Sequence, residues 1–253
     1  MLDTLLHWLQ TASWLEVSLA FLAENLLIFG LVILLGNWIA RRYSFRPVTL
    51  PPSRLTYTEL TVAIGNVLLN TFVTLIGWQL WLRGMIRFRS DVGLAVIADV
   101  FILLFTMDLL MYGLQRIAHT PVLYPLLHRF HHRYQRLRPL TLFALNPFEN
   151  LAFGALWLLV ISIYPSSWAG MSVYLTLNVA FGAVGHLGVE PVPSQWADRP
   201  VLRFIAGSSF HAQHHQDANH NYGFYTLIWD RLFGTLQPDY AQSYGRVPES
   251  VAP

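Results

Sequence analysis

Apolar stretches separated by short polar loops run through most of the chain. Three of them reach the roughly 20 apolar residues that a helix needs to cross a bilayer: 18–40, 58–82 and 92–114. Two shorter apolar stretches, 151–164 and 168–187, are divided by the turn-forming sequence YPSS and predict a hairpin of two helices. The pattern therefore predicts an all-α fold, a multi-span transmembrane helical bundle with about four membrane-crossing helices or helix hairpins.

The composition agrees with a membrane protein and excludes several other classes. Only 12% of the residues are charged and the mean hydropathy is positive, which is the wrong balance for a soluble domain. The formal net charge of +2 gives no reason to expect a nucleic-acid partner. Because the chain has no cysteine, disulfides, thiolate-ligated haem or iron–sulfur clusters and cysteine nucleophiles are excluded. No basic segment precedes the first span, so we expect that span to be an uncleaved helix.

The arginines predict the orientation of the bundle, because basic residues collect in the cytoplasmic loops of membrane proteins. The loops on one side carry nine arginines: Arg41, Arg42, Arg46, Arg54, Arg116, Arg129, Arg133, Arg136 and Arg138. The opposite side carries three: Arg83, Arg87 and Arg89. We therefore expect an integral, multi-pass protein of a bacterial inner membrane, with the loops 41–57 and 116–150 and the tail from residue 190 in the cytoplasm.

Histidines in the second half of the chain indicate a metal site. The pattern H-x-x-H-H occurs twice, in HRFHH and HAQHH, and with two isolated histidines it supplies eight candidate ligands: His119, His128, His131, His132, His186, His211, His214 and His215. In a helix, this spacing places three imidazoles on one face, where they can serve one metal or bridge toward two. His7 stands alone near the start, and we assign it no role.

The number and type of ligands narrow the metal. Imidazole suits Zn, Cu, Fe and Ni, and eight imidazoles exceed what one tetrahedral or octahedral ion requires. The H-E-x-x-H motif of zinc proteases and the Glu-x-x-His pairs of soluble di-iron proteins are absent from the sequence. The chain thus predicts a dinuclear, histidine-rich site on a helical cap at the cytoplasmic membrane surface.

From Asp108 to Gly234 the chain resembles the fatty acid hydroxylase/sterol desaturase superfamily of integral membrane di-iron oxygenases. That family shows D-x-x-x-Y-x-x-H-R-x-x-H, then H-x-x-H-H, an isolated histidine after a helical hairpin, and a second H-x-x-H-H followed by NYG and WDRLFGT. This chain reads DLLMYGLQRIAH, HRFHH, GHLGVE and FHAQHHQDANHNYGFYTLIWDRLFGTL. The stretches IAGSSFHAQHH and NYGFYTLIWD, in the last third, are most similar to the sterol C-5 desaturases.

The resemblance implies that the eight histidines bind two non-haem iron ions, with zinc as a possible substitute. One position departs from the family pattern, because Gln115 stands where the family has its first histidine. A glutamine carbonyl is a weaker donor than imidazole for late transition metals. Gln115 could ligate directly, hold a metal-bound water or leave a coordination position open, or it could mark a lost metal and a lost activity.

Further polar residues are candidates to support the imidazoles. Three carboxylates could accept imidazole N–H bonds: Asp108, Glu149 and Asp230. For Asp230, a salt bridge or a helix cap is an equal alternative. Asp99 could act in the same way or form a polar contact between spans. We expect His220 to lie at the surface or behind the ligands, although it could replace the missing ligand, and we expect residues 221–223 to shape a turn.

The resemblance also implies an activity. Two ferrous ions, dioxygen and external electrons would hydroxylate or desaturate a lipid or sterol-like substrate. Since the chain has no G-x-G-x-x-G fingerprint, we expect a separate electron donor, such as a ferredoxin or cytochrome with its reductase. The alternative is a non-oxygenase descendant, either a zinc-binding membrane protein or an inactive relative that binds lipid. Residues 1–90 are expected to be N-terminal transmembrane helices, and residues 91–253 a single catalytic region.

Overall fold

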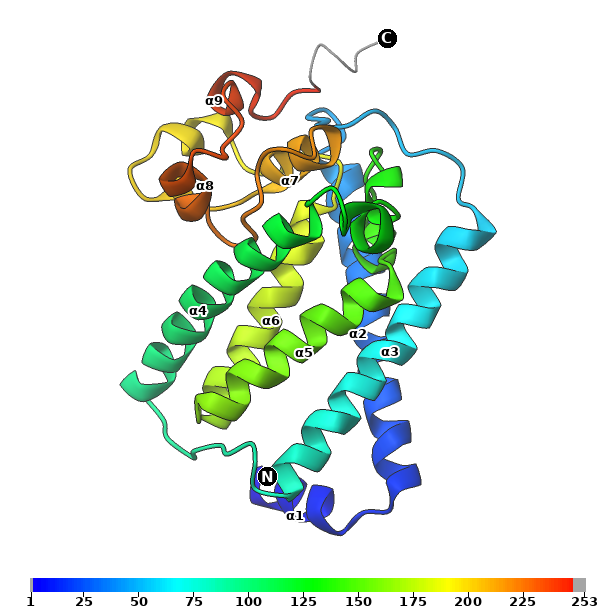
Figure 1. Ribbon diagram of the computed structural model, residues 1–253, viewed down its shortest axis with the longest axis vertical. Helices are drawn as coiled ribbons and strands as arrows, with labels where there is room; N and C mark the ends of the chain where they lie inside the picture. The colour runs from blue at the N-terminus through cyan, green and yellow to red at the C-terminus, as the bar shows by residue number, and fades with distance from the viewer. Residues whose placement is uncertain (1, 248–253) are drawn as a thin grey trace.

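The computed structural model describes residues 2–247, and within this range it consists of helices, connecting loops and three isolated β-bridges. Five long helices form a bundle: α2 (Trp14–Arg42), α3 (Tyr57–Leu82), α4 (Leu94–Ala118), α5 (Pro147–Ile163) and α6 (Trp168–Gly185). Helix α1 (Leu2–Thr11) lies across the foot of the bundle (Figure 1). Shorter elements complete the chain: η1 (Tyr124–His128), η2 (His131–Arg133), η3 (Pro139–Phe143), η4 (Ser194–Asp198), η5 (Leu202–Phe204), α7 (Ser208–Gln216), α8 (Ile228–Phe233) and α9 (Tyr240–Ser243). The predicted all-α class is confirmed.

Four helices are long and apolar enough to cross a membrane, namely α2, α3, α4 and α6. The predicted spans begin and end within four residues of these helices. Helix α5 has 17 residues and is shorter than the other members of the bundle. Large apolar side chains cover the outside of the long helices; Leu34 of α2, for example, is 70% exposed. A continuous apolar surface on four helices of membrane-spanning length suits lipid rather than water, so the protein is an integral membrane protein.

A buried polar cluster ties the helices together at the foot of the bundle. The carboxylate of Asp99, in α4, accepts hydrogen bonds from the guanidinium of Arg89 at 2.9 Å and from the hydroxyl of Tyr164 at 2.6 Å. It also accepts the backbone N–H of Ser167 at 2.7 Å, just where α6 begins. A Cβ atom at Gly170 would lie 2.6 Å from the Cβ of Asp99, so glycine is required for this close packing. Asp99 therefore forms a polar contact between spans.

A second polar cluster holds the opposite end, where the loop 119–146 folds over the helices. The amide of Asn66, in α3, donates to the carbonyl oxygens of Phe143 and Leu145 at 2.9 and 2.8 Å. Arg138 forms an ion pair with the buried Glu59 of α3. These contacts fix the end of the loop on α3, because an unpaired buried polar group would be costly. They thereby set the start of α5, which carries Glu149.

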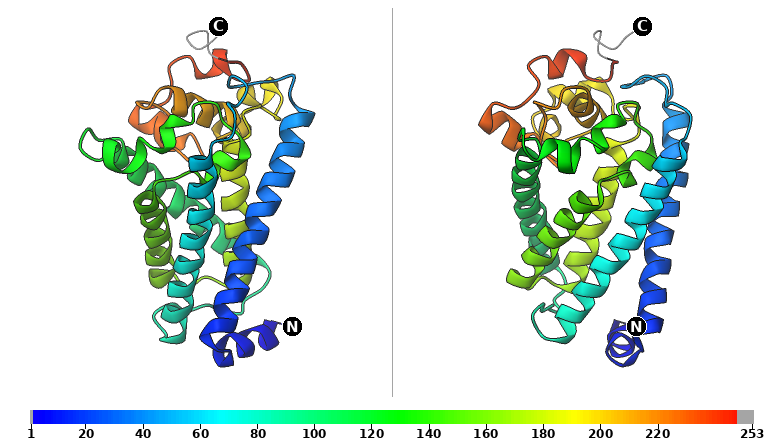
Figure 2. Two further views of the ribbon diagram at one scale, coloured as in Figure 1. Left: turned by 90° about the vertical axis from the view of Figure 1, so that its right-hand side faces the viewer. Right: turned by 45° about the vertical axis from the view of Figure 1, so that its right-hand side comes forward.

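The directions of the helices bring all the clustered histidines to one end of the bundle. Helices α2, α4 and α6 run toward this end, and α3 and α5 begin there (Figure 2). The loops after α2 and α4 and the chain from α6 to residue 247 therefore meet above the bundle and form a cap (Figure 1). The loops at 41–57 and 116–150 and the tail from 190 to 247 share one end, as their arginines led us to expect.

Candidate metal centre

Five elements position the eight histidines: the ends of α4 and α6 in the bundle, and η1, η2 and α7 in the cap. His119 follows the last residue of α4, and His186 follows the last residue of α6, so the two isolated histidines lie at helix ends. The first H-x-x-H-H motif runs from the end of the π-helical turn η1 into the 3₁₀ turn η2, and the second lies within α7. The expectation of a shared helical face therefore holds for the second motif, whereas the first is split between two tight turns. π-helical turns of this kind are frequent at functional sites.

The eight rings form two groups of four. The His119 group consists of His119, His128, His132 and His214, and the His186 group consists of His131, His186, His211 and His215. Within each group, one ligand atom per residue lies within 4.8 Å of the others. Six of the eight residues are buried, and His119 and His211 are partly exposed. All eight candidates that the sequence indicated are thus brought together, and no one motif supplies a whole group.

Each H-x-x-H-H motif gives two histidines to one group and one histidine to the other, and the two motifs do so with the groups exchanged. The first and last histidines of each motif, four residues apart, enter one group, and the middle histidine enters the other. In α7, His211 and His215 belong to the His186 group and His214 belongs to the His119 group. The first motif does the reverse, because His131 is its member of the His186 group. The two motifs therefore interlock, and each group needs both of them.

Hydrogen bonds at Nδ1 fix the orientation of four rings. His131 and His186 meet the backbone carbonyl oxygens of Ala144 and Gly182 at 3.3 and 2.8 Å. The Nδ1 atom of His214 lies 2.8 Å from the carbonyl oxygen of His220, and that of His128 lies 2.6 Å from a carboxylate oxygen of Glu149. Because these oxygens accept, each Nδ1 carries the proton and each Nε2 presents a lone pair.

The Nε2 atoms of several rings face one another at the separation expected around one ion. Contacts between Nε2 atoms join His131 to His186 at 3.4 Å, His186 to His211 at 3.1 Å and His211 to His215 at 3.1 Å. Metal–nitrogen bonds of about 2.0–2.1 Å place neighbouring ligand nitrogens roughly 2.8–3.4 Å apart at angles between right-angled and tetrahedral. His131 and His186 both use their protons at Nδ1, so their facing Nε2 atoms are two lone pairs. A cation between them makes this arrangement favourable, and the residues therefore fit a bound metal.

Burial keeps the imidazoles neutral, which is the form that binds metal. It lowers the pKa of His186 to about 4, with a hydrogen bond to the Gly182 backbone opposing the shift. It lowers the pKa of His214 to about 3 and that of His119 to about 2, and the neighbouring rings add to both shifts because a second positive charge nearby is unfavourable. Burial and the neighbouring rings also lower the pKa values of His131, His211 and His215.

Gln115 lies one helical turn before His119, on the same side of α4. Its side chain is 8% exposed, and its Oε1 atom has no hydrogen-bond partner among the residues that the structure describes. The Nε2 atoms of His119 and His128 also lack partners within the described chain. Buried acceptors without partners are rare, and these three belong to or adjoin the His119 group. The glutamine oxygen is thus available to a metal or to a water bound to it.

Two of the three candidate carboxylates do not contact an imidazole. Asp108 accepts hydrogen bonds from Tyr225, Thr226 and Trp229, and Asp230 accepts from Tyr222, Gly223 and Thr235: six residues of the segment after α7. The candidate bond to a histidine ring is therefore wrong for both, because donors from residues 222–235 occupy these carboxylates instead. Glu149 has the expected role, through its contact with His128.

The segment after α7 is a turn that faces the His119 group. Asn221 has φ of 61°, and its side chain donates to the carbonyl of Phe210 at 3.1 Å. The turn itself lies at residues 218–219, and Asn221 follows it, so the expectation of a turn at residues 221–223 stays a prediction. His220 contacts Asp217 through Nδ1 and supplies only its backbone carbonyl to the site, so it does not replace the missing ligand.

One supporting residue was not predicted. Glu190 is fully buried, and its carboxylate accepts the backbone N–H and the hydroxyl of Ser209 at 2.9 and 2.7 Å. This fixes the first turn of α7, where a carboxylate is also favoured by the helix dipole. The sequence signal was a single carboxylate four residues after His186 in a chain with few charges.

Comparison with known proteins places this site in a family. The model of the family described as fatty acid hydroxylase matches residues 100–235, more than half of the chain and all eight histidines. The chain belongs to the fatty acid hydroxylase family. The resemblance inferred from the motifs is confirmed, and it includes the similarity to sterol C-5 desaturases, because such proteins are among the relatives.

Those relatives are sterol-modifying enzymes by name. Delta(7)-sterol 5(6)-desaturase of Eremothecium gossypii is 30% identical over 165 residues, which are 65% of this chain and 42% of that protein. Lathosterol oxidase of Rattus norvegicus is 31% identical over 167 residues, 62% of this chain and 52% of that protein. The human lathosterol oxidase is 27% identical over 178 residues, 66% and 56% of the two chains. This chain thus spans about half the length of the curated relatives it matches. No solved structure matches it.

Proposed function

We propose that this protein is a membrane-bound non-haem di-iron oxygenase that hydroxylates or desaturates a lipid or sterol-like substrate. The observation that carries the proposal is the pair of four-imidazole groups at the end of a membrane bundle. Membership of the fatty acid hydroxylase family supports the reaction class, and the sterol desaturases among the relatives support the substrate class.

The proposal assigns one iron to each histidine group. Two such ions, when bound, would supply the dioxygen activation and the oxidising power needed to remove hydrogen from an unactivated C–H bond. The chain supplies the rest. Carbonyl oxygens and Glu149 hold the Nδ1 protons, so that the Nε2 lone pairs face the ions. Burial excludes water and keeps the rings neutral.

The electrons come from a separate protein in this proposal, such as a ferredoxin or cytochrome with its reductase. Arg129, Arg133 and Arg136 are exposed and flank the buried histidines of the first motif. An exposed basic surface next to the site suits an acidic donor, because complementary charges steer association.

We propose that the histidine end faces the cytoplasm, as in a bacterial inner-membrane protein. The cap carries the nine arginines of the two loops and four more in the tail, Arg199, Arg203, Arg231 and Arg246, against three at the foot. Residues 91–253 would form the catalytic region and residues 1–90 its membrane support. Arg133→Cys and Asp217→Cys, on this cysteine-free background, should react only with reagents applied from the cytoplasmic side. Labelling from the other side would reverse the orientation.

Gln115 favours a second candidate, a zinc-binding or inactive relative that binds lipid without oxidising it. Metal analysis of the purified protein and lipid analysis of cells with and without the gene test both candidates. The oxygenase predicts two irons per chain and a hydroxylated or desaturated lipid that disappears with His131→Ala. Zinc or no metal after growth in iron-rich medium, with an unchanged lipid profile, would favour the second candidate. Iron-rich growth matters because histidine sites accept the wrong ion readily.

A further inference from the structure

An apolar groove, the lateral groove, runs along the outer face of α6 beneath the cap. Its α6 wall consists of Leu177, Ala180, Phe181 and Val184, which recur every three or four residues and so share one face of the helix. The apolar residues of the other wall follow α6 or lie near α9: Val192, Trp196, Leu202, Ile205, Tyr240 and Tyr244. The groove has a cavity volume of about 210 Å³ and is partly open to the outside. This is smaller than the roughly 300–1,000 Å³ of typical small-molecule sites, so the groove encloses only part of a lipid-sized molecule.

The position of the groove determines what can enter it. Its α6 wall belongs to a helix that is long and apolar enough to cross a membrane, so the mouth opens toward the bilayer. Trp196 and Ile205, in the opposite wall, are both 42% exposed. Apolar side chains that remain exposed at this level suit contact with lipid rather than water.

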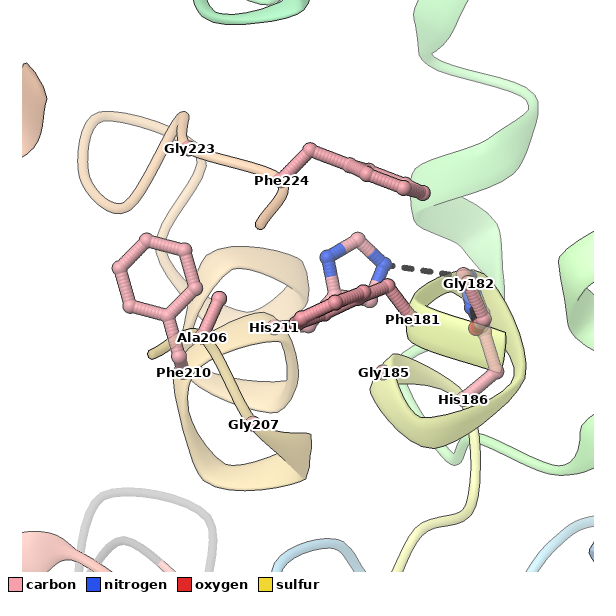
Figure 3. A pocket seen from close by; sticks show the side chains of 10 residues that line it. All are labelled: Phe181, Gly182, Gly185, His186, Ala206, Gly207, Phe210, His211, Gly223 and Phe224. Atoms are coloured by element: carbon pink, nitrogen blue, oxygen red, sulfur yellow. Dashed lines mark hydrogen bonds between the residues drawn. The ribbon is translucent and has the colours of Figure 1, made fainter. Parts of the chain in front are cut away.

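The inner end of the groove adjoins a much smaller cavity, of about 10 Å³, beside the metal centre. The two cavities share Phe181, Ala206 and Gly207. The inner cavity is lined by His186 and His211, both of the His186 group. Figure 3 shows the ring of Phe181 on one side of the His211 imidazole and Phe224 on the other. Phe181 and the small inner cavity therefore separate the groove from the ligands of one metal position.

Glycines on α6 allow the groove wall to pack close to the metal centre. A Cβ atom at Gly185 would lie 3.2–3.3 Å from three atoms of His211, and a Cβ atom at Gly182 would lie 2.9 Å from a methyl group of Leu142. Larger side chains at either position would push α6 away from the ring or fill the inner cavity.

We propose that the lateral groove binds the hydrocarbon body of the lipid substrate, which enters from the bilayer beside α6 and presents its reacting carbon to the His186 group. The proposal rests on the proposed oxygenase function. Arg203, the charged residue of the lining, is exposed and suits the polar end of such a molecule. The His119 group then lies on the far side of the His186 group from the entering substrate.

Photolabelling tests the groove without requiring turnover. The full-length protein is reconstituted in phosphatidylcholine vesicles that contain a diazirine-bearing fatty acid or, in a parallel arm, a diazirine-bearing sterol. After irradiation, mass spectrometry locates the label, and metal content is measured on the same samples. We expect labelling of the peptides around 177–184 and 192–207 that an excess of the unlabelled lipid removes. The arm that labels identifies the kind of lipid.

The key variant is Ala180→Trp, with Ala169→Trp as its control. Both alanines are exposed on α6, eleven residues apart and thus on nearly the same face, but Ala169 lies at the foot and does not line the groove. We expect Ala180→Trp to reduce labelling of the groove by about tenfold, because bulk in an apolar site excludes the ligand. Ala169→Trp should label like the wild type, and both should keep the wild-type metal content.

The outcomes separate the groove from the oxygenase. The proposal that the groove binds lipid would be wrong if Ala180→Trp left groove labelling unchanged. It would also be wrong if the groove were labelled no more strongly than the outer face of α2. Neither result would contradict the proposed oxygenase activity. Competed labelling in a protein that forms no oxidised lipid would support the groove and count against the oxygenase. Phe181→Ala tests whether the substrate reaches the metal centre past Phe181, because removing the ring should extend labelling to the peptide that carries His211.

Discussion

The His119 group and the His186 group each contain four imidazoles, but they differ in the residues that hold those imidazoles in place. In the His186 group, two rings donate from Nδ1 to backbone carbonyl oxygens within the described chain. Three contacts between Nε2 atoms link its four rings one after another. The His119 group has the carboxylate of Glu149 behind His128 and one such contact, between His132 and His214 at 3.2 Å. It also has Gln115 beside it. The His186 group borders the lateral groove. The His119 group therefore differs in the residues beside its ligands, and the His186 group differs in lying next to the groove.

The largest effect should come from removing one ligand of either group. His214→Ala should empty the His119 group and His131→Ala the His186 group, so each variant should hold about one metal ion per chain. Both should abolish oxygen chemistry, whereas His7→Ala should change neither property. Metal content by mass spectrometry and spectroscopy of the remaining iron are the measurements. Wild-type metal content in both cluster variants would contradict the two-group assignment.

Glu149→Gln should affect only one group. A carboxylate that accepts an imidazole N–H raises the basicity of the ligand, and its loss typically weakens metal binding about 10- to 100-fold. We therefore expect one of the two binding steps in a competitive titration to weaken by this amount, and the weakened step should be the one missing in His214→Ala. If both steps weakened equally, the two groups would not be independent.

Gln115 should have a smaller effect on the same step. Gln115→Ala should weaken that metal about tenfold, the lower end of the range for a group that acts through a bound water. Gln115→His should bind it at least as tightly as the wild type, because imidazole is the stronger donor. Equal affinities in all three proteins would show that position 115 does not touch the site. A wild type with one metal, restored to two by Gln115→His, would indicate a degenerate centre.

The smallest effect is expected at His220. Its contribution to the site is a backbone carbonyl that accepts from Nδ1 of His214, and alanine keeps that carbonyl. His220→Ala should therefore leave both titration steps within about twofold of the wild type, since the lost contact with Asp217 is at the surface and worth little. A lost metal in this variant would show that the imidazole ring itself takes part.

The sequence by itself determined the elements of the fold and the type of ligand. A bilayer requires long apolar segments wherever a helix crosses it, so the boundaries of α2, α3 and α4 could be predicted closely from the apolar pattern alone. The duplicated H-x-x-H-H motif likewise gave six of the eight imidazoles of the site, and the isolated His119 and His186 gave the other two. Glu149 was a candidate because carboxylates are scarce in this chain.

Only the tertiary structure decided how those ligands are shared. Spacing within a motif describes one helical face, but His132 and His214, which are 82 positions apart, meet because the loop after α4 packs against α7. Tertiary packing likewise brings Tyr225, Thr226 and Trp229 to Asp108, so that this carboxylate accepts from them and not from an imidazole. Local periodicity carries no information about such contacts, because they depend on which faces of distant segments bury each other. The lateral groove has the same origin, since its two walls come from α6 and from a segment that folds back over it.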